Sequence, residues 1–119
     1  MDKKKEYTIE YVEFSATSGS EVAVAKRFYD EVFHWTFQDW GDDYIDTASS
    51  GLPSGFNADP EQRTKHPLAV IYASDLSAAS NRIVAAGGRI TKETFSFPGG
   101  KRFHFTDPLG NELAVWSDQ

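Results

Sequence analysis

The chain has 119 residues, of which 39% are hydrophobic and 14% aromatic, and its formal net charge is −6. This length supports one compact domain and is too short for two independent cores, so we expect a single domain over residues 1–119. The negative charge disfavours nucleic acids and anionic membranes as partners, because proteins that bind them usually present a basic surface. The absence of cysteine excludes disulfides, thiolate nucleophiles and cysteine-ligated zinc.

No segment contains the run of about 20 apolar residues that a membrane-spanning helix needs, and the first residues lack the apolar centre of a signal peptide. We therefore expect a cytoplasmic location and no membrane partner. The run Lys3-Lys4-Lys5 is short, and we expect it to be solvated.

Residues 7–14 predict the first strand, because aromatic and β-branched side chains are frequent there. The two-residue period of a strand places Tyr11 and Glu13 on one face. The same period places Val12 and Phe14 on the other face, which we expect to lie against a helix.

A helix is predicted to begin after Ser18, which forms a capping box with Glu21, and to end near Phe33. Residues 35–56 consist of short aromatic and β-branched pieces separated by turn residues, which predicts a meander of short strands. Residues 57–65 are polar and predict a connecting loop. The expected apolar stripe of the helix consists of Ala25, Phe28, Tyr29, Val32 and Phe33.

The same pattern then begins again. Residues 67–73 predict a strand, Asp75 is the N-cap of a second helix, and Gly87-Gly88 ends that helix through left-handed backbone. The apolar face of this helix is expected to contain Leu76, Ala79, Ile83 and Ala86. Further strands are predicted over residues 89–97, 103–106 and 112–116.

The segment from Phe105 to Trp116 predicts a tight turn that leads into the last strand. Asp107 can accept hydrogen bonds from the backbone ahead of it, Pro108 fixes φ, and Gly110 tolerates positive φ. Alternation after the turn indicates a strand with one face against helices and the other towards a cavity.

The order of strand, helix and three strands therefore occurs twice, over about residues 7–58 and 67–117. Aligning the two first strands places Tyr11 on Leu68, an offset of 68 − 11 = 57 residues, and the same offset relates Ala114 to Asn57. Each module alone would leave one sheet face uncovered, so we expect the two modules to close on each other.

Several motifs that cover nearly the whole chain give it a family resemblance. They are Ile9-Glu-Tyr-Val-Glu-Phe14, the segment from Ala25 to Trp35, Asp75-Leu76, Ala86-Gly87-Gly88 and the segment from Phe105 to Asn111. In this order they resemble the vicinal oxygen chelate superfamily, which includes glyoxalase I, bleomycin resistance proteins and extradiol dioxygenases. The resemblance implies an α+β fold, in which paired βαβββ modules form a half-open, eight-stranded mixed-sheet cup. It also implies a homodimer with a ligand in the concave face.

Metal-dependent members of this superfamily take His, Gln or Glu ligands from the first and last strands of each module. The resemblance places Tyr11, Leu68, Ala114 and Asn57 at those positions. Leucine and alanine side chains have no lone pair, so we predict no catalytic metal of the family type and no other cofactor. A divalent metal held by another set remains an alternative, and that set is His66, Glu13 and Glu112.

Glu13 is the candidate catalytic residue, because its carboxylate is predicted to face the cup, where it could act as a base or bind the amine of a ligand. The alternative is a salt bridge or hydrogen bond within the sheet. We assign ligand binding to Tyr11, Tyr72, Glu112 and Trp116. The rings of Tyr11, Tyr72 and Trp116 could stack on a flat ligand or fill a closed core.

Two histidines have other predicted positions. His34 follows the first helix and is expected to interact with its C-terminal dipole. His104 lies between Phe103 and Phe105, so it faces away from both, and the sequence leaves open whether that side is the cup.

The leading hypothesis is a cytoplasmic, homodimeric protein of the glyoxalase and bleomycin resistance type that binds a small organic molecule without a metal. One alternative is a metal-dependent lyase, isomerase or dioxygenase related to glyoxalase I, so the sequence leaves open whether the protein is an enzyme. Another alternative is a resistance protein that sequesters a cationic drug through acidic and aromatic residues.

Overall fold

The computed structural model describes residues 4–119, so Lys3 of the predicted solvated run lies outside the described residues. The chain divides into two compact units. We call residues 11–68 the first unit, and residues 4–10 together with 69–119 the second unit.

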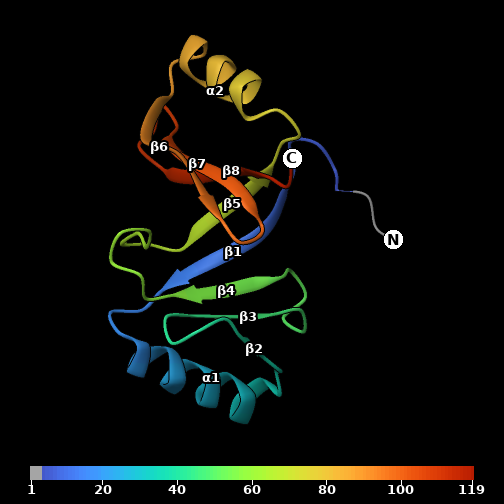
Figure 1. Cartoon of the computed structure of the whole chain (residues 1–119), viewed down its shortest axis with the longest axis vertical. Coiled ribbons are helices and arrows are strands. Elements are labelled where there is room, and N and C mark those ends of the chain that lie inside the picture. The colour runs from blue at the N-terminus through green and yellow to red at the C-terminus, as the bar shows by residue number, and fades with distance from the viewer. Residues whose placement is uncertain (1–3) are drawn as a thin grey trace. The chain divides into compact units, whose positions relative to one another are not determined.

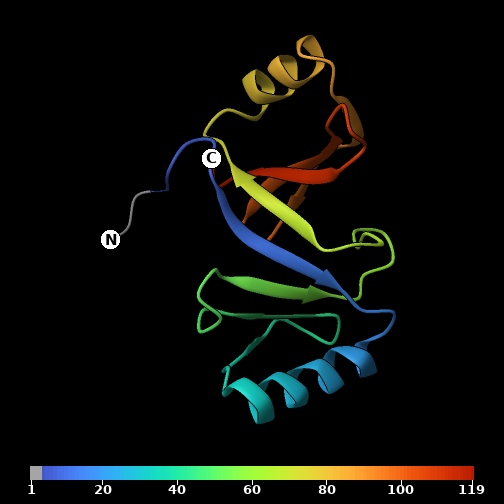
Figure 2. The ribbon, with the colours of Figure 1, turned by 180° about the vertical axis from the view of Figure 1, so that it is seen from behind.

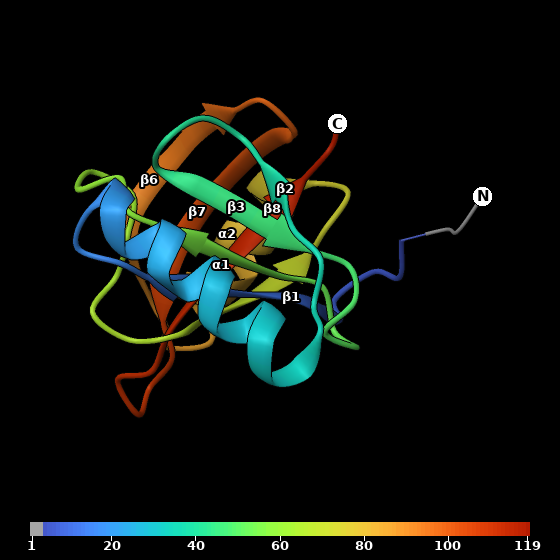
Figure 3. The same cartoon turned by 90° about the horizontal axis from the view of Figure 1, so that it is seen from below.

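The sheet of the first unit is built from β1 (Ile9–Ser15), β2 (Gln38–Asp39), β3 (Tyr44–Thr47) and β4 (Ser54–Asn57). β1 pairs in parallel with β4, and β3 pairs antiparallel with both β4 and β2. The helix α1 (Gly19–Phe33) contacts β3 and β4 and covers one face of this sheet (Figure 3).

Local hydrogen bonds explain where α1 begins and ends. Ser18 is the N-cap, and its side chain accepts from the backbone N–H of Glu21. Glu21 Oε1 accepts in return from Thr17 N at 2.7 Å, so the reciprocal bond of the predicted capping box goes to the residue before Ser18. His34 is the C-cap in left-handed backbone, with φ of 60°, and its N–H donates to the carbonyls of the last turn. The predicted helix-end position of His34 is therefore confirmed.

The buried face of α1 differs from the predicted stripe. Val22 is buried, and Ala25 and Tyr29 pack against the core, whereas Phe28 and Phe33 are 52% and 56% exposed. Phe28 precedes Tyr29 by one residue, which is about 100° around a helix, so both rings cannot face the sheet. Val32, which was also expected in the stripe, is exposed as well.

The second unit repeats the pairing of the first (Figure 1, and from behind in Figure 2). Its strands are β5 (Leu68–Tyr72), β6 (Arg89–Phe97), β7 (Gly100–Thr106) and β8 (Glu112–Ser117). β5 pairs in parallel with β8, and β7 pairs antiparallel with β8 and β6. The helix α2 (Leu76–Ala85) contacts β6 and β8.

The helix starts confirm the internal repeat. Asp75 caps α2 by accepting from Ala78 N at 3.0 Å, as predicted. Asp75 and Ser18 are separated by 75 − 18 = 57 residues, the offset that the first strands gave. Gly87, with φ of 100°, follows α2 in the expected left-handed conformation.

Each unit buries its own apolar cluster on the face of the sheet that its helix covers. The first cluster contains Ala16, Val22, Ile45, Phe56 and Ala58. The second contains Ala73, Ala79, Phe103, Phe105 and Val115. Alternate residues of the same strands therefore lie on the opposite face, where most candidate site residues are found.

Two predicted strand starts are wrong. Tyr7 was expected in the first strand, but it has φ of 62° in a turn, and β1 begins at Ile9. β7 begins at Gly100 rather than at Phe103, because the preceding turn uses only the residues just after Phe97. Neither described helix combines the length and apolar character that are needed to cross a bilayer.

The predicted turn before β8 is confirmed. Asp107 Oδ1 accepts from the backbone N–H groups of Leu109 and Asn111, each at 2.9 Å, and Gly110 has φ of 90°. Asn111 Nδ2 donates to Asp107 Oδ2 at 3.0 Å. These bonds, led by that from the Asn111 side chain, hold the pKa of Asp107 below its ordinary value, because they stabilise the charged form.

Asp107→Ala is expected to lower stability in a pH-dependent way. The folded-state pKa of Asp107 is depressed, so its carboxylate stabilises the fold above the unfolded value of about 3.9. That stabilisation is lost as pH falls through the folded pKa. Urea unfolding of wild type and Asp107→Ala should therefore give a difference in free energy that is constant above about pH 5 and shrinks in acid.

Asp107→Asn is the matched control, because it keeps an acceptor oxygen for the two backbone N–H groups. It removes the charge together with the acceptor for Asn111 Nδ2, so its difference from wild type measures both. A difference between wild type and Asp107→Ala that stays the same at every pH would contradict this account.

Candidate functional site

Glu13 lies in a hydrogen-bonded cluster on the sheet face of the first unit that points away from α1. Its side chain is 3% exposed. Tyr44 Oη donates to Glu13 Oε2 at 3.1 Å, and Asn57 Nδ2 donates to Glu13 Oε1 at 3.2 Å. Both carboxylate oxygens are therefore engaged, which a buried charge requires.

The hydroxyl groups of Tyr11 and Tyr44 are 2.5 Å apart. An ionised carboxylate only accepts, so the hydroxyl hydrogen of Tyr44 is committed to Glu13. Either hydroxyl could be the donor in the contact between the two tyrosines, and we infer that Tyr11 donates to Tyr44. The three side chains form a directed chain from Tyr11 through Tyr44 to Glu13, in which each donor polarises the next.

Gly55 provides the space for this chain. It pairs with Glu13 across β1 and β4, and a Cβ atom there would collide with the hydroxyl oxygens of both Tyr11 and Tyr44. The sequence interpretation missed Tyr44 and Gly55 as site residues. A glycine inside a strand signals a close approach by other atoms, and this signal at Gly55 could have found the cluster.

The second unit places His104 and Glu112 together. His104 is 1% exposed, and its Nδ1 lies 3.4 Å from Glu112 Oε2. Thr91 Oγ1 donates to the same carboxylate oxygen at 3.2 Å. Phe103 and Phe105 belong to the core cluster under α2, so His104 faces away from that helix. Within the second unit, the structure therefore decides on which face of the sheet His104 lies, which the sequence left open.

Tyr72 and Trp116 are register partners on β5 and β8, with ring centroids 5.5 Å apart. Trp116 Nε1 donates to Glu10 Oε1 at 2.6 Å, and Tyr72 Oη donates to Asp118 Oδ1 at 2.8 Å. The bond to Asp118 raises the pKa of Tyr72, because a carboxylate acceptor stabilises the protonated phenol.

The structure thus gathers the predicted site residues within each unit. Tyr11 and Glu13 share one cluster in the first unit, and Tyr72 and Trp116 share another in the second. Glu112 contacts His104 rather than either of these ring residues.

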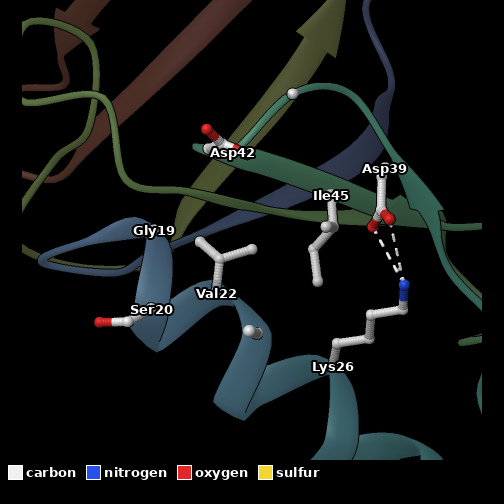
Figure 4. Close-up of a pocket in the computed structure, with 9 residues that line it drawn as sticks. Gly19, Ser20, Val22, Lys26, Asp39, Asp42 and Ile45 are labelled. Atoms are coloured by element: carbon white, nitrogen blue, oxygen red, sulfur yellow. Dashed lines mark hydrogen bonds and ion pairs between the residues drawn. The ribbon is translucent and has the colours of Figure 1, made fainter.

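A shallow hollow of about 380 Å³ lies between α1 and the β2–β3 hairpin (Figure 4). Lys26 forms an ion pair with Asp39 at 3.1 Å on its wall. No predicted site residue lines this hollow, and its ammonium and carboxylate already neutralise each other. Its lining consists of Gly19, Ser20, Val22, Ala23, Lys26, Asp39, Gly41, Asp42 and Ile45.

The residues at the family's metal positions do not fit a metal ion. Leu68 and Ala114 are buried and carry no donor atom, and Asn57 already donates to Glu13. The alternative set is not supported either, since residues 4–119 contain no group of three or more His, Asp or Glu side chains that could hold a metal. His66 is exposed and precedes β5.

A comparison with protein family models shows the superfamily of this chain. The family model described as the Glyoxalase/Bleomycin resistance protein/Dioxygenase superfamily matches residues 16–115. The chain therefore belongs to this superfamily, the vicinal oxygen chelate group that the motifs indicated. No curated protein matches the chain.

Solved structures show the same fold at low sequence identity. A structure described as NAD-dependent benzaldehyde dehydrogenase from Legionella pneumophila has a TM-score of 0.73 at 13% identity, covering 90% of this chain and 96% of that one. A superfamily member from Vibrio splendidus 12B01 has a TM-score of 0.67 at 13% identity, covering 92% and 99%. The Mn(II)-bound glyoxalase from Novosphingobium aromaticivorans has a TM-score of 0.66 at 20% identity, covering 98% of this chain and 40% of its own.

The expected fold class is confirmed by these matches and by the strand pairing. The chain is an α+β protein of two βαβββ modules, with eight strands in parallel and antiparallel pairs. At such sequence identities the similarity establishes the fold alone, and the activities of these proteins are not assigned to this chain.

Gly55→Ala is expected to disrupt the cluster and to destabilise the protein by about 1–3 kcal/mol, the usual cost of overpacking. Thermal and urea unfolding measure this cost. The same substitution in a Tyr11→Phe, Tyr44→Phe background should cost less, because the hydroxyl oxygens that it strikes are absent. Equal costs in the two backgrounds would contradict the described packing.

Calorimetric titration with zinc, nickel, manganese and ferrous iron is expected to show no stoichiometric binding. The reason is the loss of donor atoms at Leu68 and Ala114. Binding of one ion per chain that His66→Ala abolishes would overturn this expectation.

Proposed function

We propose that this protein binds a small organic molecule without a catalytic metal, and that the cluster of Tyr11, Tyr44 and Glu13 forms the polar part of the binding site. The observation that carries the proposal is the buried Glu13 side chain, which accepts a hydrogen bond from Tyr44, whose hydroxyl in turn contacts that of Tyr11. A purely apolar pair of side chains would stabilise this sheet at lower cost, because a buried charge must be compensated by hydrogen bonds.

The direction of the chain defines the chemistry that it favours. Tyr11 donates to Tyr44, and Tyr44 donates to Glu13, so the negative charge makes the Tyr11 oxygen a stronger acceptor. A ligand with an N–H, O–H or ammonium donor suits such an oxygen. The net charge of −6 also favours cationic over anionic ligands.

The same chain supports a second candidate function, metal-independent proton abstraction. A proton taken by the Tyr11 oxygen would be balanced by transfer of the Tyr11 hydrogen to Tyr44 and of the Tyr44 hydrogen to Glu13. The substrate would be left as a carbanion or enolate and Glu13 as a neutral acid. This is the chemistry of an isomerase or lyase, with Glu13 in the catalytic role that the sequence suggested.

The family's metal-dependent reactions are not proposed, because two of the four ligand positions carry leucine and alanine. A homodimer and a cytoplasmic location remain our predictions from the resemblance and the composition.

Ligand-observed NMR with a library of small amines, alcohols and keto acids tests the binding proposal. For a ligand found in this way, Tyr44→Phe is expected to weaken affinity by about tenfold, because it interrupts the chain to Glu13. Glu13→Gln should weaken it as well. Tyr29→Phe is the matched control, since this ring lies on the α1 face of the sheet.

Affinities that survive Tyr44→Phe and Glu13→Gln in folded protein would show that the cluster is structural only. For each bound ligand, exchange of carbon-bound hydrogen in heavy water, with a chelator present, distinguishes the two functions. Exchange that Glu13→Gln abolishes supports proton abstraction, and binding without exchange supports a binding protein.

A further inference from the structure

Lys4 lies over the face of Trp116, with its Nζ atom 5.3 Å from the ring centroid. Tryptophan is the aromatic side chain with the strongest attraction for cations. Lys4 is exposed, so burial does not force its ammonium group into this position. Lys4 is thus exposed as expected and has a ring partner as well, and the contact marks the face of Trp116 as a place where a cation lies.

The Trp116 ring is held at its edge and flanked by other rings. Its Nε1 donates to Glu10 Oε1 at 2.6 Å, which fixes the plane of the indole. Tyr72 lies 5.5 Å away at an interplanar angle of 73°, and Phe97 lies 6.2 Å away at 49°. Tyr72 is buried, so it supports the indole, and the accessible cation-binding surface is the face of Trp116 beside Phe97.

Charges of both signs lie near the rings, because the buried Arg102 is the register partner of Trp116 and several carboxylates share its unit. Glu10 bonds the indole, and Asp118 accepts from Tyr72 Oη at 2.8 Å. Glu6 accepts from the backbone N–H of Ser74 at 2.9 Å, at the end of β5. These carboxylates share the second unit with the three rings, and their negative potential adds to that of the ring faces.

We propose that Trp116, with Tyr72 and Phe97, forms a binding site for an organic ammonium group, and that Lys4 occupies this site as an internal competitor. Rings and a carboxylate already committed to an N–H suit a polarisable, weakly hydrated cation rather than a metal ion, which requires several oxygen donors. The inference rests on residues 4–10 and 69–119 alone and does not depend on the Glu13 cluster.

The internal competitor has a measurable consequence. Lys4 is attached to the chain, so it competes as a ligand at constant effective concentration. Its removal should strengthen binding of an external ammonium compound by about two- to fivefold, the range that an exposed cation–π contact supports. Substitution of the neighbouring Lys5 should have no such effect.

Choline is the probe, and its neutral isostere 3,3-dimethylbutan-1-ol is the matched control ligand. The full chain is titrated at constant ionic strength, and the indole N–H signal of Trp116 is followed by NMR. We expect a saturable shift with choline, a much weaker response to the neutral isostere, and tighter choline binding in Lys4→Ala than in Lys5→Ala. Trp116→Leu should abolish binding, and Glu10→Gln should weaken it.

No choline-dependent shift of the Trp116 signal in wild type or Lys4→Ala would overturn the proposal. An equal response to the isostere would also overturn it, because apolar contact would then explain the binding. If Trp116→Leu does not fold, the comparison of Lys4→Ala with Lys5→Ala decides, since both keep the ring. Equal choline affinities in those two variants would remove Lys4 from the site.

Discussion

The alternation of side chains along the strands is the constraint on which this structure depends. In each unit a helix covers one face of the sheet, and every second residue on the strands builds the core under it. The intervening residues must lie on the opposite face. There the chain places a glutamate, three tyrosines, a histidine and a tryptophan, and most of them are held by hydrogen bonds to other side chains.

Polar side chains on the sheet face opposite the helix are costly to bury, and the hydrogen bonds that they form indicate the chemistry of that face. Glu13 is buried beside Tyr44 and Asn57, and Gly55 leaves the room that two tyrosine hydroxyls need. A buried carboxylate is tolerated only when its oxygens are satisfied, so the cluster works as a set.

Membership of the superfamily establishes the fold of this chain and leaves its chemistry to the side chains at the site. The strand pairing repeats in both units, whereas leucine and alanine stand at two positions where the resemblance implies metal ligands. The fold is set by apolar patterning, turns and caps, whereas a metal site is set by a few donor atoms. Those few positions can change while the core stays intact. Binding by hydrogen bonds and aromatic rings is the chemistry that the remaining side chains support.

The sequence by itself determined the elements: the caps at Ser18 and Asp75, the turn at Asp107, the repeat and the family all follow from local signals within a few residues. Only the tertiary structure decided which residues meet in the candidate sites. Tyr44 meets Glu13 across 31 positions of chain, and Lys4 meets Trp116 from the other end of the sequence. The face of α1 and the side taken by His104 were likewise fixed only by packing. Periodicity specifies which residues share a face, but strand register and helix rotation, set by the whole core, specify which of them touch.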